Sequence, residues 1–181
     1  MTPEDYAFTR QWWDKLLADD ARMIRWLQKL WATEHAGYDD NYQAAKRWSG
    51  GNIGVMNIFM KTGDDELRHA ALLETVLKGR GAWPITETPP ESTYWEDMDK
   101  GVVSLETCAA VFYMGEHLAA ERFQVLLDHE GTPADIKGFL VSALPDERHH
   151  ARVFRKLTTP AALADMQARH DAAVARIKGK T

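Results

Sequence analysis

Cysteine is almost absent from this chain of 181 residues, in which Cys108 is the only one. A single cysteine excludes a disulfide framework within the chain and any metal site built from cysteines alone. Long apolar runs are also missing, because no stretch approaches the ~20 residues that a membrane-spanning helix requires. We therefore expect no membrane partner, and a reducing, cytoplasmic setting fits the cysteine usage.

An excess of basic residues is absent as well. The formal net charge is −5 at pH 7, which gives no reason to expect a nucleic-acid or anionic-membrane partner. The first residues, MTPEDYAFTR, lack a basic region followed by an apolar one, so we expect no signal peptide. The length and the hydrophobic content of 45% fit one globular domain over residues 1–181.

Residues that break secondary structure are few, and they divide the chain into long helical patterns. They cluster at 49–52 (SGGN), 83–93 (WPITETPPEST), 130–135 (EGTPAD) and 157–163 (LTTPAAL). The patterns predict an all-α fold with bundle helices at about 19–48, 52–80, 102–130 and 133–157, and flanking helices at about 3–17 and 160–178. The 83–93 segment is predicted to be an extended connection. Thr132 and Thr159, each followed by proline, are candidate N-caps.

Six ionisable residues lie on the helix faces that should form the core. Apolar residues recur at steps of three and four in each predicted bundle helix, which places them on one face. The same faces carry Glu34, Glu66, His69, Glu116, Glu147 and His150. Two of the helices repeat an E-x-x-H spacing, which puts a carboxylate and an imidazole one turn apart on one side of the helix.

The four acids also lie at matching heights. Glu34 and Glu66 lie about sixteen residues before and after the Gly50–Gly51 turn, and Glu116 and Glu147 flank the turn at 131–132 at about fifteen residues. At ~1.5 Å per residue, each acid is ~23–25 Å from its turn, near the middle of an antiparallel bundle. The long segment 81–101 would then join the two helix pairs as a crossover connection.

Four carboxylates and two imidazoles in an apolar core need a counter-charge, because each ionised group is costly to bury without a partner. Two divalent cations would balance the four glutamates. Mixed oxygen and nitrogen ligands suit iron or manganese, with zinc as a further option. The alternative is that these acids lie on solvated helix faces and bind nothing.

Over residues 19–157 the pattern resembles the ferritin-like superfamily of di-iron carboxylate proteins. The resemblance implies a four-helix bundle with one long crossover, with a glutamate from each of two helices and E-x-x-H from the other two. It implies two iron ions as cofactors, with manganese or a mixed iron–manganese pair as alternatives. It also implies that Glu34 and His69 bind one metal, that Glu116 and His150 bind the other, and that Glu66 and Glu147 bridge the two.

Two segments resemble particular families within that superfamily. DDELRHAALLETVLKGRG resembles the second helix of bacterioferritins, and DERHHARVF resembles the last bundle helix of rubrerythrins. The chain departs from rubrerythrins in two respects. One cysteine cannot form their four-cysteine rubredoxin iron site, and Ala119 stands where they carry a second acid in the third helix.

Four residues near the predicted ligands are candidates for a supporting role. Tyr113 and Tyr38 each lie one turn from a ligand, so the spacing predicts that both face the cluster. There a tyrosine could hydrogen-bond a ligand or carry a radical, whereas packing as an ordinary core tyrosine is the alternative. Asp65 and Asp146 each precede a ligand glutamate and are candidate acceptors for a histidine N–H.

These features predict a dinuclear non-haem iron oxidase or oxygenase. It would use dioxygen or peroxide to oxidise a small organic substrate, and an external electron donor would supply reducing equivalents. The alternative is a ferroxidase or iron-handling protein, for which ferrous iron is itself the substrate. A structural metal-binding module is the third option. We expect no nucleic-acid partner and allow for a homodimer.

Overall fold

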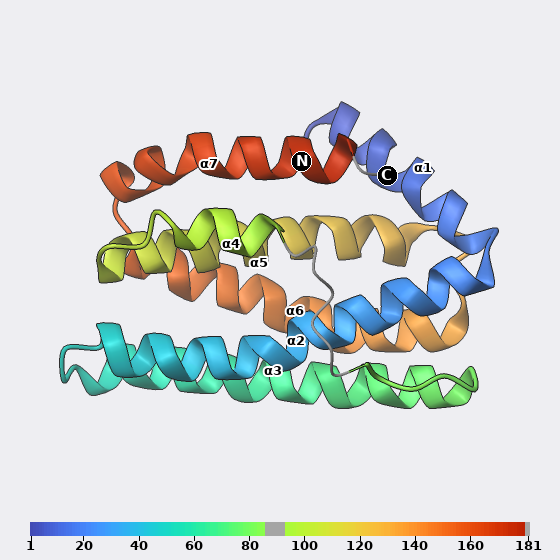
Figure 1. Cartoon of the computed structure of the whole chain (residues 1–181), viewed down its shortest axis with the longest axis horizontal. Helices are drawn as coiled ribbons and strands as arrows, with labels where there is room; N and C mark the ends of the chain where they lie inside the picture. The colour runs from blue at the N-terminus through green and yellow to red at the C-terminus, as the bar shows by residue number, and fades with distance from the viewer. Residues whose placement is uncertain (86–92, 180–181) are drawn as a thin grey trace.

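In the computed structural model, which describes residues 1–85 and 93–179, every regular element is an α-helix (Figure 1). The elements are α1 (Pro3–Leu17), α2 (Asp20–Trp48), α3 (Ile53–Gly79), α4 (Thr93–Asp99), α5 (Leu105–Asp128), α6 (Ala134–Leu157) and α7 (Pro160–Gly179). The all-α class predicted from the sequence is confirmed. Among the described helices, none is long and apolar enough to span a membrane.

Two antiparallel helix pairs make the bundle. The most extensive packing is within the pair α2–α3 and within the pair α5–α6, and the pairs join through α3 with α6 and through α2 with α5. Figure 1 shows α2 and α3 beside one another in the lower part of the view, with α5 and α6 above them. This is the four-helix arrangement with one long crossover that the spacing of the acids predicted.

The tight turn between α2 and α3 depends on glycine. Gly50 and Gly51 have φ values of 56° and 84°, which are in the left-handed region that only glycine adopts without strain. Asn52 then starts α3, because its side chain accepts a hydrogen bond from the Val55 amide at 3.2 Å. The short turn holds α2 and α3 antiparallel and so fixes the relative height of their side chains.

The end of the crossover is helical, which the sequence reading did not predict. Residues 86–92 of the predicted extended connection lie outside the described residues, and α4 follows them. Tyr94 and Met98 are four residues apart and both are buried, so α4 has an apolar face. This face packs on α7 and α5. A seven-residue helix carries too few turns for its periodicity to stand out in a sequence.

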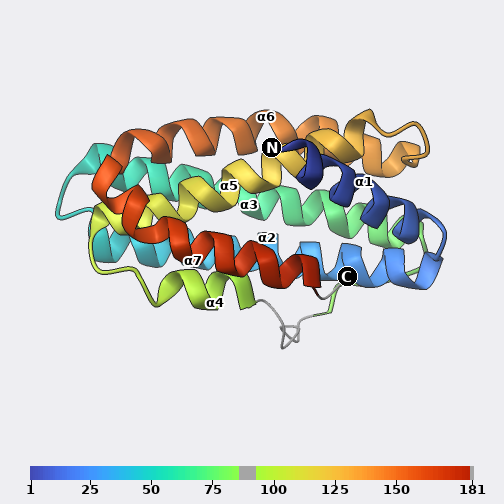
Figure 2. The ribbon, with the colours of Figure 1, turned by 90° about the horizontal axis from the view of Figure 1, so that it is seen from above.

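The flanking helices cover the side of α5 that faces away from α6. Helix α1 contacts α5 and α2, and helix α7 contacts α5 and α4. Figures 1 and 2 show α1 and α7 over α5, outside the four bundle helices. Trp13 of α1 and Met166 of α7 are fully buried there. Helix α5 is therefore enclosed on more than one side.

Thr132 does not cap α6, so that prediction was wrong. The cap position is Pro133, which has no side-chain hydrogen bond to the helix. The Thr132 hydroxyl instead accepts from Trp13 Nε1 at 2.7 Å and donates to the Leu126 carbonyl at 2.5 Å. It thus ties α1 to the α5–α6 turn. Thr159 does cap α7, because its hydroxyl accepts from the Ala162 amide at 3.2 Å.

We predict that Thr132→Val lowers the free energy of unfolding by about 1–3 kcal/mol, because the Trp13 indole N–H loses its buried acceptor. Thr33→Val is the matched control. Thr33 is exposed, and within the part of the chain that the structure describes its hydroxyl bonds only to the Lys29 carbonyl of its own helix, so the change should be within about 0.5 kcal/mol. Urea denaturation followed by circular dichroism measures both. Equal losses of unfolding free energy in the two variants would contradict a stabilising hydrogen bond between Trp13 and Thr132.

Candidate metal centre

The structure brings together all six ionisable residues singled out in the sequence. Each of the four bundle helices supplies at least one, and none of the six has a relative exposure above 8%. They are Glu34 from α2, Glu66 and His69 from α3, Glu116 from α5, and Glu147 and His150 from α6. The alternative of solvated helix faces therefore does not hold.

The six residues form two overlapping groups of potential ligands. In the first group, one ligand atom from each of Glu34, Glu66, His69 and Glu147 lies within 4.8 Å of the others. The second group consists of Glu66, Glu116 and His150 under the same limit. Glu66 belongs to both groups, as a bridging ligand would.

Buried polar atoms inside the cluster lack hydrogen-bond partners, which is the property expected of a cation site. Glu66 Oε1, Glu147 Oε1 and His150 Nδ1 are buried and have no hydrogen-bond partner among the described residues. His150 Nδ1 comes within 3.3 Å of Glu66 Oε1, but without hydrogen-bond geometry. Leaving such buried atoms without a partner is costly. Metal ions would bind the two carboxylate oxygens and, once it has lost its proton, the imidazole nitrogen. The residues present therefore fit a metal group.

Each histidine is oriented by an aspartate from the opposite helix pair. His69 Nε2 of α3 donates to Asp146 Oδ2 of α6 at 3.4 Å, and His150 Nε2 of α6 donates to Asp65 Oδ2 of α3 at 3.4 Å. A carboxylate that accepts from Nε2–H leaves the Nδ1 lone pair facing the cluster. Both aspartates were candidates for this role in the sequence, although the crossing of the pairs was not foreseen.

Arg68 links the two aspartates, a role that the sequence pattern did not predict. Its guanidinium hydrogen-bonds Asp146, and its Nε lies 3.9 Å from Asp65 Oδ1. The half-exposed guanidinium therefore forms a cap over the two Asp–His pairs. Its position next to His69 is the only sequence signal, and one arginine in a charged helix is too common to stand out.

The electrostatics of the cluster show strong mutual repulsion among the acids. Burial, and then the nearby Glu66 carboxylate, raise the pKa of Glu34 well above its usual value, and the same causes raise the pKa of Glu116. Burial alone would lower the pKa of His69, but ion pairs with Glu147 and Glu34 outweigh it and raise the pKa to about 11. Without metal, protons therefore supply the positive charge that the carboxylates need.

The pKa of His150 follows the same balance. Burial opposes its protonation, whereas contacts with Glu116 and Glu66 favour it and raise the pKa to about 11. The closest approaches are 3.3 Å from Nδ1 to Glu66 and 3.7 Å to Glu116. Both imidazoles must lose a proton before either can bind a metal through Nδ1.

Helix α4 adds two aromatic side chains near Glu116. The Trp95 ring packs so closely on Gly115 that a Cβ atom at that position would collide with it. The Tyr94 hydroxyl donates to His170 Nδ1 of α7 at 2.9 Å. Burial and the Glu116 carboxyl raise the pKa of Tyr94, so its hydroxyl stays protonated. The sequence reading missed both residues, because α4 itself was not predicted.

The two tyrosines expected to face the cluster make their ring contacts with other side chains, and their role at the cluster stays a prediction. The Tyr113 ring stacks on His117 with a centroid distance of 5.7 Å and lies beneath the Arg155 guanidinium. The Tyr38 ring packs on Tyr42 at 4.6 Å. Tyr113 also lines a pocket together with His117, Arg155 and residues of α7.

The Rubrerythrin family model matches residues 31–158. This range is more than half of the chain and contains all six residues of the cluster. Comparisons with curated proteins and with solved structures give no significant match. The match confirms the resemblance to di-iron carboxylate proteins that the sequence motifs suggested.

We predict that Asp65→Asn and Asp146→Asn each weaken ferrous-ion binding by about 10–100-fold, because a histidine loses the acceptor that orients it. Asp64→Asn is the control, since Asp64 is exposed and, among the described residues, accepts from Tyr42 alone, at 3.1 Å. Competition with a chromophoric chelator under anaerobic conditions measures the affinities. Wild-type affinity in both test variants would show that the crossed pairs do not position the imidazoles.

Proposed function

The chain belongs to the rubrerythrin family, and from this premise we propose that it is a dinuclear non-haem iron oxidoreductase. It uses dioxygen or peroxide to oxidise a small organic substrate. The observation that supports this proposal most directly is the buried cluster of four glutamates and two histidines with unsatisfied acceptor atoms. A structural metal site would not need so many buried ionisable ligands.

We assign the ligands in two sets that share carboxylates. Glu34 and His69 would hold one ion, Glu116 and His150 would hold the other, and Glu66 and Glu147 would be shared between them. The membership of Glu66 in both groups supports its bridging role. When bound, two iron ions supply the redox and Lewis-acid chemistry of the reaction.

The protein's own side chains prepare the centre in three ways. Asp65 and Asp146 accept hydrogen bonds from Nε2–H of the histidines, so the Nδ1 atoms face the cluster. Tyr94 and Trp95 of α4 cover α5 near Glu116 and exclude water from that side. Water exclusion strengthens every charge interaction within the centre.

Electrons come from an external donor in this proposal, because the chain has no thiol couple of its own. Cys108 is the sole cysteine. It is buried, and burial together with Asp99 raises the pKa of its thiol to about 12. A reducing cytoplasmic compartment would supply such a donor. A homodimer is compatible with the proposal, which does not require one.

We predict that Glu66→Ala and Glu147→Ala each abolish binding of the second metal ion, because each removes a bridging carboxylate. Glu74→Ala is the matched control on α3, where Glu74 pairs with Lys78 at the surface. This control should retain two ions per chain. Metal analysis after anaerobic loading and desalting gives the stoichiometry. Full occupancy in Glu147→Ala would refute its assignment as a bridge.

We also predict that the protein loaded anaerobically with two ferrous ions per chain reacts with dioxygen faster than free ferrous iron does. Stopped-flow absorbance in the near ultraviolet follows the oxidation. The reaction should stop after about two irons per chain when excess ferrous iron is added, because the iron is a cofactor. Continued oxidation into a soluble mineral would instead establish the ferroxidase alternative. No acceleration, with two irons bound, would rule out both functions.

A further inference from the structure

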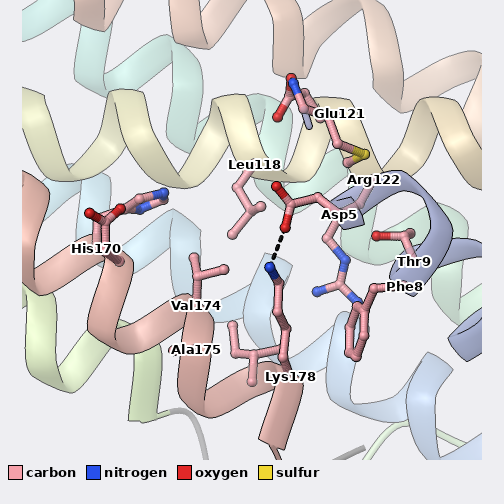
Figure 3. Close-up of a pocket in the computed structure, with 13 residues that line it drawn as sticks. Asp5, Phe8, Thr9, Leu118, Glu121, Arg122, His170, Val174, Ala175 and Lys178 are labelled. Carbon is pink, nitrogen blue, oxygen red and sulfur yellow. Dashed lines mark hydrogen bonds and ion pairs between the residues drawn. The ribbon is translucent and has the colours of Figure 1, made fainter. Parts of the chain in front are cut away.

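A cavity of about 340 Å³ lies between α1, α5 and α7, outside the four-helix bundle (Figure 3). Its walls share no residue with the metal cluster. Leu118 and Arg122 line it from α5, whereas the cluster residue of α5 is Glu116. The volume is at the lower end of the range of about 300–1,000 Å³ that is usual for small-molecule sites. A ligand in this cavity would therefore not touch the metals.

Arg122 is the unusual residue of this cavity. Among the residues that the structure describes, no carboxylate or hydrogen-bond acceptor pairs with its guanidinium, whose charge contact is the Trp12 ring, 4.7 Å from Cζ to the centroid. Burial lowers the pKa of Arg122 to about 10. Arg10 and Arg80, in contrast, form hydrogen-bonded ion pairs with Glu130 and Asp135. A partly buried cation without an anion is costly, and an anionic ligand would remove that cost.

Two of the three carboxylates on the cavity wall form ion pairs, and the third accepts a hydrogen bond from a neutral amide. Asp5 pairs with Lys178, as the dashed line in Figure 3 shows, and Glu121 pairs with the Met1 amino group. Asp171 accepts a hydrogen bond from Gln167 at 2.8 Å. These carboxylates would repel a multiply charged anion such as a phosphate. A ligand with one negative charge is repelled less and matches the single positive charge of Arg122.

The rest of the wall is apolar. Phe8 from α1, Leu118 from α5, and Val174 and Ile177 from α7 line the cavity beside Arg122. Figure 3 shows the Arg122 guanidinium beside the Phe8 ring, with Leu118 and Val174 further along the same cavity. Apolar side chains with one fixed charged group are the usual composition of a site for an amphipathic small molecule.

We infer that this cavity binds a small organic monocarboxylate with an apolar chain, whose carboxylate pairs with the Arg122 guanidinium. The planar guanidinium can donate two parallel hydrogen bonds to a carboxylate. The apolar chain would lie against Leu118 and Val174. The site is separate from the metal centre, so the inference stands whether or not the proposed reaction is correct.

Isothermal titration calorimetry of the full-length protein with octanoate tests the inference. Wild-type protein should bind one octanoate per chain, and hexanoate should bind about tenfold more weakly because two methylene groups are lost. Arg122→Met should weaken octanoate binding at least about tenfold, because the charged hydrogen bonds are lost. Arg10→Met removes the same charge from a residue of α1 that pairs with Glu130 outside the cavity, and it should leave binding unchanged.

Octanol distinguishes carboxylate recognition from general adsorption of an apolar chain. It should bind wild-type protein more weakly than octanoate does, and Arg122→Met should not weaken it further. These two measurements on wild-type protein remain decisive even if Arg122→Met does not fold. Absence of saturable octanoate binding, equal affinity for octanoate and octanol, or equal losses in Arg122→Met and Arg10→Met would each overturn the inference.

Discussion

The burial of four carboxylates within one apolar bundle is the constraint on which the rest of the structure depends. Desolvation raises the pKa of Glu34 and Glu116, while contact with the acids raises the pKa of both histidines. The cluster therefore holds protons when it holds no cation. Metal binding exchanges those protons for charge fixed at defined positions, so the centre must be linked to pH as well as to metal. The surrounding side chains then fix the positions of the ligands and the directions in which their binding atoms point.

Orientation comes from contacts between the two helix pairs more than from within either one. The Asp146–His69 and Asp65–His150 hydrogen bonds both cross between α3 and α6, and Arg68 lies over both aspartates. Packing of one pair on the other therefore sets the direction of the lone pairs. A disturbance at the α3–α6 contact should reach the metals without touching any ligand. On the other side of the bundle, α4 places Trp95 against α5, where only glycine leaves room for it.

The fold and the cluster were predictable because their signals are periodic and repeated. The sequence alone places the six residues in the core, without any knowledge of tertiary contacts. The signals are the apolar helix faces, the turns, and two E-x-x-H pairs at matching heights. The remaining features depend on which helix covers which. Tyr113 stacks on His117 and lines a pocket with residues of α7. Thr132 accepts a hydrogen bond from Trp13 of α1 instead of capping α6. Tyr94 gains its surroundings from α5 and α7, and Arg122 gains its surroundings from α1 and α7. The local sequence does not encode how these helices dock.

The crossed Asp–His pairs give the centre an approximate two-fold symmetry. Within each helix pair the ligands follow one another at nearly the same separations, as Glu34, Glu66 and His69 in one pair and Glu116, Glu147 and His150 in the other. Each helix pair also supplies the aspartate that orients the histidine of the other pair. Either pair folded without the other would leave its histidine without that acceptor, so assembly of the centre is cooperative between the two pairs.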